Sequence, residues 1–234
     1  ALLVMVALVA STEAIGSTTV AEYQEGNLSA AGGLQIDDTI LEINGRRIRI
    51  STDVAYALIH SQGEPCDILV QRDGETVALS GVSFPVDEQT GSAVIDFYFY
   101  RAPFTPATVL HEAFFRCVTM MREIYWSLGG MFTGEVSIDD LTGPVGTTQA
   151  ISEVSKQGMA ALTYFAVFIS INLGIVNLLP IPALDGGRLF LLLVEKLRGK
   201  PISAELEGGI NLIGFALLML LVIFVTWRDI RALF

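Results

Sequence analysis

Asp185 is the residue of this chain best placed to do chemistry, because it directly follows a long stretch without charge. The 26 residues 159–184 carry no charged side chain, and an ionisable group beside such a stretch is costly and usually functional. Prolines and glycines flank it and prevent a regular helix there. They are Pro180, Pro182, Gly186 and Gly187. Asp185 could be a hard oxygen ligand or a proton relay; alternatively, it caps a helix that begins near Arg188.

A second candidate, His111-Glu112, does not complete a metal-binding pattern. The zinc motif H-E-x-x-H places two imidazoles on one helix face, but position 115 is Phe115. The chain holds only one other histidine, His60, so it cannot form a two-histidine zinc site by itself. We interpret the pair as an interfacial histidine beside an exposed glutamate.

Two apolar segments must position Asp185. Residues 208–227 form a second uncharged stretch of 20 residues, and about 20 apolar residues span a bilayer as a helix. We predict a membrane core at 159–234, with spanning helices at 159–179 and 208–227. A short helix at 189–197 lies between them.

The apolar residues 1–12 are too few to span a membrane. They lack the positive start and the small-residue cleavage site of a signal peptide. We expect them to be the tail of a truncated transmembrane helix, which would make the sequence a fragment of a longer protein.

Between these segments, the sequence predicts a small α/β domain at 17–86. Its elements are strands at 20–23, 39–43, 66–71 and 76–79, and a helix at 52–59. Ser51 or Thr52 could cap this helix. Asn44-Gly45 and Asp73-Gly74 are strong two-residue turn signals.

Residues 87–158 are predicted to hold a strand at 92–100, an amphipathic helix at 104–130 and a connector. The helix beyond the connector begins at Pro144. The amphipathic helix carries Glu112, Arg116 and Glu123 on one face and large apolar residues on the other. Those residues are Leu110, Phe114, Val118, Met121, Tyr125 and Leu128. Such a helix suits a membrane interface or a groove between helices.

The charge of −11 is unevenly distributed. Residues 11–140 hold 7 basic and 19 acidic side chains, whereas residues 141–234 hold 7 and 6. This acidity, without a basic patch, excludes a nucleic-acid footprint. The two cysteines, Cys66 and Cys117, have no metal or disulfide pattern, and we expect two unpaired buried thiols.

The segment 33–45 resembles the core signature of bacterial PDZ domains, G-L-x-x-G-D-x-I-x-x-I-N-G. It departs at Asp37, where the family has glycine; if that position needs a positive φ, aspartate tolerates it better than most residues. The resemblance implies that an extended peptide or C-terminus binds at a sheet edge. A structural insert that binds nothing is the alternative.

The segment 177–188 resembles N-x-x-P-x-P-x-L-D-G-G, the signature of the site-2 protease family of intramembrane zinc metalloproteases. Gly143-Pro144-Val145-Gly146 is similar to the bacterial, PDZ-containing branch, which includes the regulator-of-sigma-E protease. The resemblance covers nearly the whole chain. It implies an α-helical integral membrane core with an inserted small α/β PDZ-like domain.

The resemblance also implies residue roles. Asp185 matches the carboxylate that completes Zn²⁺ coordination, and Asn172 and Asn177 match asparagines that contact the substrate or transition state. Asn177 could instead be a helix-terminal cap. The H-E-x-x-H helix, with the catalytic glutamate, has no match in this chain and would lie before Ala1. The implied reaction is cleavage of a transmembrane protein substrate, such as an anti-sigma-factor-like protein or a signal-peptide remnant.

Charge sets the expected topology. The loop between the spanning helices holds four basic residues, Arg188, Lys196, Arg198 and Lys200, which makes it cytoplasmic by the positive-inside rule. The PDZ-like domain would then be extracytoplasmic, on a multi-pass protein of the bacterial cytoplasmic membrane. Arg228 and Arg231 argue weakly for the reverse. Two other functions stay open: a non-catalytic PDZ membrane adaptor, and a transporter or proton relay that uses Asp185.

Overall fold

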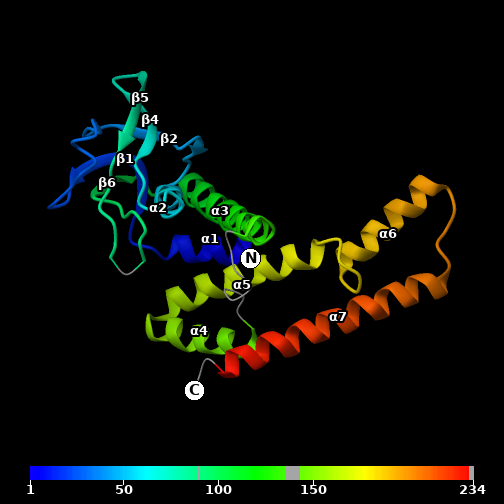
Figure 1. Cartoon of the computed structure of the whole chain (residues 1–234). Helices are drawn as coiled ribbons and strands as arrows, with labels where there is room; N and C mark the ends of the chain where they lie inside the picture. Colours follow the sequence, from blue (N-terminus) through cyan, green and yellow to red (C-terminus); the bar gives the residue numbers. More distant parts are fainter. Residues whose placement is uncertain (89, 135–142, 232–234) are drawn as a thin grey trace. The chain divides into compact units, whose positions relative to one another are not determined.

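The computed structural model describes residues 1–88, 90–134 and 143–231 (Figure 1). It divides into an N-terminal unit, Leu2–Thr119, and a C-terminal unit that holds Met120–Phe234. The helix α3, Pro106–Thr133, continues across this division. The predicted connector within 87–158 lies partly outside the described residues, at 135–142.

The N-terminal unit is built around an antiparallel sheet of six strands in the order β5-β4-β2-β1-β6, with β3 paired to β2. The strands are β1 (Ile15–Tyr23), β2 (Thr39–Ile43), β3 (Arg46–Arg47), β4 (Cys66–Arg72), β5 (Glu75–Val82) and β6 (Phe97–Ala102). Helix α2, Ser51–Ile59, lies beside the sheet (Figure 1). Its Val54 and Leu58 are buried in the same hydrophobic core as the strand residues. A further helix, α1, spans Leu2–Ala10.

Both predicted hairpin turns are present. Asn44 and Gly45 have φ of 48° and 73°, and Asp73 and Gly74 have 52° and 86°. Two successive positive φ angles match the twist of paired strands, which is why asparagine, aspartate and glycine occupy such turns. Asp37 also has a positive φ, 72°, so this aspartate adopts the conformation expected where the PDZ signature has glycine.

The last strand lies further along the chain than predicted. It covers Phe97–Ala102 rather than 92–100, and its register pairs Ala102 with Ile15. Before it, the Asp96 carboxylate accepts the backbone N–H groups of Leu28 and Ser29 at 2.7 and 2.9 Å. The sheet therefore extends beyond the predicted 17–86 segment.

Helix α2 is capped differently from the prediction. The cap residue is Ile50, not Ser51 or Thr52. The buried Asp53 carboxylate reaches back to the N–H groups of Arg49 and Ile50, at 2.8 and 3.3 Å. Its other oxygen accepts the hydroxyl of Thr119 in α3, so a single carboxylate both caps α2 and holds α3 beside it.

The two faces of α3 are reversed relative to the sequence interpretation. Glu112, which we expected to be exposed, is buried and pairs with Arg116 at 2.9 Å. Leu110 and Phe114 are instead exposed. A buried carboxylate persists when it has a cationic partner one turn away, and an amphipathic pattern alone does not tell which face meets the protein.

The C-terminal unit contains the helices α4 (Pro144–Lys156), α5 (Met159–Leu178), α6 (Asp185–Arg198) and α7 (Ala204–Arg231). Pro144 occupies the first turn of α4 as predicted. Helices α5 and α7 are long and apolar enough to cross a membrane. Only 17% and 11% of their most apolar windows are buried, unlike the core helix of a soluble protein.

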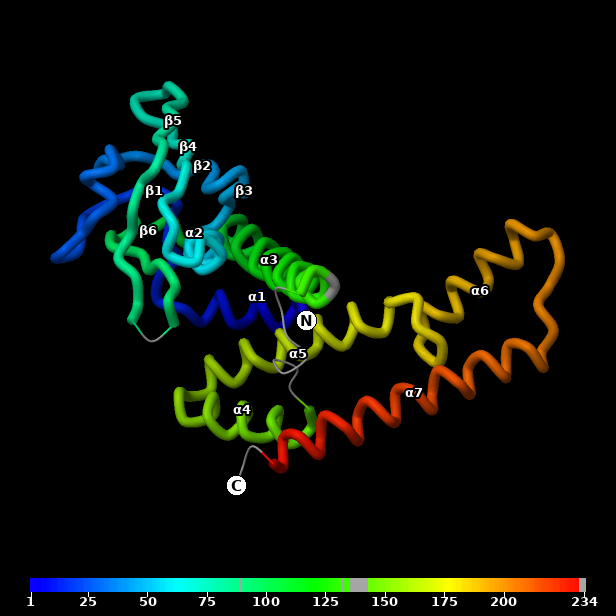
Figure 2. Tube along the Cα trace, viewed as in Figure 1, coloured from blue at the N-terminus to red at the C-terminus, as the bar shows by residue number. Residues whose placement is uncertain are grey.

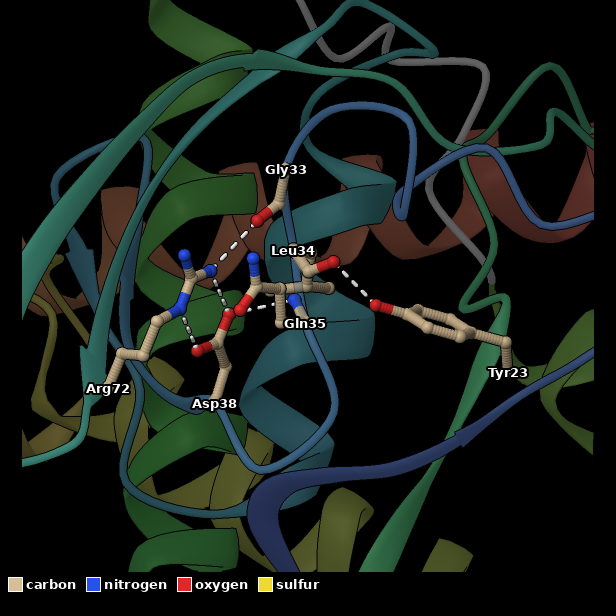
Figure 3. A network of polar contacts seen from close by, with 6 residues as sticks. All are labelled: Tyr23, Gly33, Leu34, Gln35, Asp38 and Arg72. Carbon is tan, nitrogen blue, oxygen red and sulfur yellow. Dashed lines mark hydrogen bonds and ion pairs between the residues drawn. The ribbon is translucent and has the colours of Figure 1, made fainter.

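An ion pair between a buried aspartate and a partly exposed arginine fixes the loop that carries the PDZ-like signature (Figure 3). Arg72, at the end of β4, contacts both carboxylate oxygens of Asp38 at 2.7 Å and the carbonyl oxygen of Gly33 at 2.8 Å. Asp38 is fully buried and also accepts the N–H of Gln35. The hydrogen bond with Asp38 raises the pKa of Arg72 above its ordinary value. One arginine thus closes the loop 33–38.

We expect Arg72→Met to destabilise the protein by about 3–5 kcal/mol, because it leaves the Asp38 charge buried without its partner. Urea or thermal unfolding of the purified intact protein measures this change. The matched control is Arg47→Met on β3, where the arginine is exposed. Equal stability of the two variants would contradict a role for the pair in closing the loop.

Candidate functional site

The end of α5 and the start of α6 form a tight turn that presents Asp185. Helix α5 ends at Leu178, and α6 begins at Asp185 itself, earlier than the predicted 189–197 helix. Pro180 follows the C-cap residue Leu179, so it stops α5 as predicted. Figure 2 shows the chain leaving α5 through a short loop before α6 begins.

Two glycines let the backbones of the two helices meet. A Cβ at Gly186 would lie 2.2 Å from the carbonyl oxygen of Leu178. A Cβ at Gly187 would lie 2.2 Å from the carbonyl oxygen of Ile181. Both glycines are buried. These positions therefore accept no side chain, which gives a physical reason for the paired glycines after Asp185.

Ala183 adopts a left-handed conformation with φ of 72°. A residue with a Cβ is uncommon there and is held by its surroundings. Its N–H donates to Oδ1 of Asn211 in α7, at 3.2 Å. Pro182 lies against Gly214, also in α7: a Cβ at 214 would be 2.5 Å from the proline Cβ and carbonyl oxygen.

Asp185 occupies the first turn of α6, and its side chain is exposed. The cap position is Leu184, so Asp185 is not the cap residue of this helix. Among the described residues, no ion pair or hydrogen bond engages its carboxylate. The positive end of the helix favours a negative charge there, and both oxygens are free to bind a cation. Asp185 thus fits the role of one oxygen ligand of zinc.

A complete zinc site is not present in the part of the chain that the structure describes. No group of three His, Cys, Asp or Glu side chains could hold a metal there. His111 is exposed on α3, where its ring packs against Phe115, and its neighbour Glu112 is paired with Arg116. Cys66 and Cys117 are buried and unpaired, as predicted, and burial raises the pKa of the Cys117 thiol.

The asparagines singled out from the sequence lie along α5. Asn177 is in the last turn, next to Leu178, whose carbonyl oxygen meets Gly186. It therefore sits at the same helix junction as Asp185. Asn172 lies five residues earlier, about 7.5 Å along the helix. Both are half-buried, and no hydrogen bond of either amide is found among the described residues.

Sequence reasoning missed two polar residues of α7, Asn211 and Asp229. Asp229 accepts the N–H of Gly146 at 2.8 Å, so its carboxylate lies at the N-terminus of α4. The backbone of Gly143 comes close to α7 at the same place, because a Cβ there would lie 2.7 Å from the side chain of Val225. The signal that could have revealed Asn211 is its position as a strongly polar side chain within the uncharged stretch 208–227. Figure 2 shows α7 passing both α4 and the α5–α6 turn.

The chain is similar to known proteins over most of its length. The model of peptidase family M50 matches residues 1–221. The regulator of sigma-W protease RasP of Bacillus subtilis is 40% identical over 91% of this chain and 51% of its own length. The probable protease eep of Enterococcus faecalis is 36% identical over 88% of the chain and 49% of its length.

A putative zinc metalloprotease of Clostridium acetobutylicum is 32% identical over 97% of the chain and 67% of its own length. The chain thus spans about half the length of the first relatives, 51% and 49% in the two cases above.

We expect Gly186→Ala to destabilise the C-terminal unit by about 1–3 kcal/mol, because the new methyl group must push α6 away from the α5 carbonyls. Unfolding of the purified protein in detergent measures the loss. The control is Gly208→Ala in α7, where an added Cβ meets nothing within 4 Å. If both alanines have the same effect, the close approach of α5 and α6 is wrong.

Proposed function

The chain belongs to peptidase family M50, the site-2 protease family, and from this we propose that the intact protein is an intramembrane zinc metalloprotease. It would cleave the transmembrane segments of membrane-anchored proteins. The observation that carries this proposal is the carboxylate of Asp185, exposed and without a protein partner among the described residues, at the turn that follows the apolar helix α5. Family resemblance adds that this carboxylate stands in the L-D-G-G signature.

We assign Asp185 as one ligand of Zn²⁺. Catalytic zinc sites keep three protein ligands and one open position, so one carboxylate needs two further ligands. We propose that the intact protein supplies two histidines and a general-base glutamate from a segment that precedes Ala1. The relatives, of which the chain covers about half, support this assignment. Zinc, when bound, would polarise the scissile carbonyl and make a bound water a stronger nucleophile.

Asn172 and Asn177 would contact the substrate. An amide side chain can donate a hydrogen bond to the oxygen that gains negative charge as the peptide bond is attacked. Asn177 is better placed for this role, because it lies at the junction with Asp185. Asn172 would hold the unwound substrate backbone further along α5.

Helices α5 and α7 would cross the membrane. Their large apolar side chains are exposed, including Leu173, Leu217 and Phe224. In a membrane, lipid would surround these side chains and keep their apolar surface out of water. The segment between them contains α6, whose last turn carries Lys196 and Arg198. We place this segment on the cytoplasmic side, and the acidic N-terminal unit on the outer side of a bacterial cytoplasmic membrane.

The N-terminal unit would select substrates as a PDZ-like domain. Strand β6 ends the sheet, and no strand of the described chain pairs with its outer edge. An extended peptide or a free C-terminus could add there as a further strand. Tyr98 and Tyr100 on β6 are 58% and 44% exposed and offer aromatic contacts. A relative's name, regulator of sigma-W protease, favours anti-sigma-factor-like substrates. Signal-peptide remnants are the other proposed substrates, because they too consist of a single apolar helix.

Asp185→Asn should abolish cleavage of a membrane-tethered substrate and lower bound zinc. The change removes a metal ligand, so we expect a loss beyond the roughly 10–100-fold typical of residues that only support a ligand. Cleavage is followed on gels, and zinc by elemental analysis of the purified intact protein. Glu205→Gln, which neutralises an exposed carboxylate of α7, is the control. An adaptor or a proton relay would bind no zinc in either form.

A photo-cross-linking residue at position 98 should capture substrate, because β6 is the proposed docking edge. The same residue at position 76, on the exposed opposite edge strand β5, is the control. The measurement is the yield of cross-linked substrate per protein. Equal yields at the two edges, or capture at position 76 alone, would mean that β6 does not dock substrate.

A further inference from the structure

We propose that Asn211 of α7 is a positioning residue for Asp185. Gly214 assists it, because the absence of a side chain there lets the turn pack against α7. This inference rests on the proposed function, in which Asp185 binds zinc. It adds a residue far from the L-D-G-G signature, on a different helix. The hydrogen bond from the Ala183 N–H to Asn211 Oδ1, at 3.2 Å, is the contact that carries it.

The turn has few backbone donors, and Asn211 satisfies the one that the turn itself cannot. Prolines 180 and 182 have no N–H. Three of the remaining N–H groups find carbonyl oxygens within or just before the turn. Leu179 donates to Val176, Ile181 to Leu179 and Leu184 to Ile181, at 3.1, 2.7 and 3.2 Å. Ala183 alone donates to a side chain on another helix.

The N–H of Ala183 needs this partner because its turn directly follows α5, which we place in the membrane, and so lies at the cytoplasmic boundary of the hydrocarbon. Hydrocarbon offers no hydrogen-bond acceptor, so a backbone N–H at that depth must be satisfied by protein. Ala183 has a positive φ, 72°, and in this conformation its N–H donates to Asn211 of α7. Without an acceptor there, the chain would regain a better conformation by rotating at residue 183. Asp185 is only two residues away and would move with it.

Gly214 supports the same contact by shape. It is buried, and a Cβ there would come within 2.5 Å of Pro182. At 100° per residue, Asn211, Gly214, Val225 and Asp229 fall within about 60° on one face of α7. The glycine therefore allows the turn to pack closely against α7, so that Asn211 can accept the hydrogen bond from Ala183.

A set of variants of the intact protein separates positioning from general packing. Asn211→Leu removes the acceptor at similar volume, and Asn211→Asp keeps an acceptor oxygen whether or not it is protonated. Gly214→Ala obstructs Pro182. Gly209→Ala is its control on the same helix, since an added Cβ there meets nothing within 4 Å. Asp185→Asn is assayed alongside them.

The readouts are zinc affinity, by competition between a chelator and added Zn²⁺, and hydrogen exchange of the amides in 180–188. We expect Asn211→Leu and Gly214→Ala to weaken zinc binding about 10–100-fold, as loss of a ligand-orienting contact does, and to speed exchange at Ala183. Asn211→Asp should stay near the unaltered protein, as should Gly209→Ala. In cleavage assays kcat should fall while KM changes little, because Asn211 holds the turn and is not one of the residues that we propose contact the substrate.

Two results would overturn the inference, and they are distinguishable. If Asp185→Asn loses zinc but Asn211→Leu and Gly214→Ala retain it like Gly209→Ala, Asn211 does not position the ligand. If Asp185→Asn itself retains zinc and activity, the proposed function fails, and this inference fails with it. Should Asn211→Leu not be recovered folded, Asn211→Ala replaces it and also lacks the acceptor.

Discussion

The arrangement of the C-terminal unit depends on one constraint: where the chain leaves the apolar helix α5, its irregular backbone must still satisfy its hydrogen-bond donors. The turn between α5 and α6 meets it with two prolines that have no N–H, two hydrogen bonds within the turn, one to the end of α5, and one side chain from α7. Because each backbone N–H of the turn has a hydrogen-bond acceptor, these bonds hold the turn in one conformation. Asp185, at its end, keeps its carboxylate free of protein partners among the described residues.

The C-terminal unit also depends on close approach between the backbones of its helices. Glycines lie at several places where elements of this unit meet: Gly143 against α7, Gly186 against the end of α5, Gly187 against Ile181 of the turn, and Gly214 against Pro182. Apolar burial gives helices little reason to associate in lipid, so small residues and a few polar contacts do this work. Helix α7 combines both, with Asn211 at the turn and Asp229 at the N-terminus of α4.

Local signals predicted much of this structure. The turn dipeptides, the uncharged stretches and the prolines after α5 each act within a few residues, so the sequence indicates them directly. The family signature likewise singled out Asp185. The partners Asn211 and Asp229 lie 28 and 83 residues from the groups they bind, and no local pattern reveals such pairs. The buried face of α3 was interpreted wrongly because Glu112 has Arg116 as a partner, and periodicity cannot show that pairing.

The most direct test of this account is X-ray absorption at the zinc edge on the purified intact protein. It reports the atoms bound to zinc. The account predicts a shell of nitrogen and oxygen at about 2.0–2.2 Å, with imidazole scattering and an oxygen signal that Asp185→Asn removes. A sulfur shell at about 2.3 Å, which would point to Cys66 or Cys117, would contradict it. A spectrum that Asp185→Asn leaves unchanged would do the same.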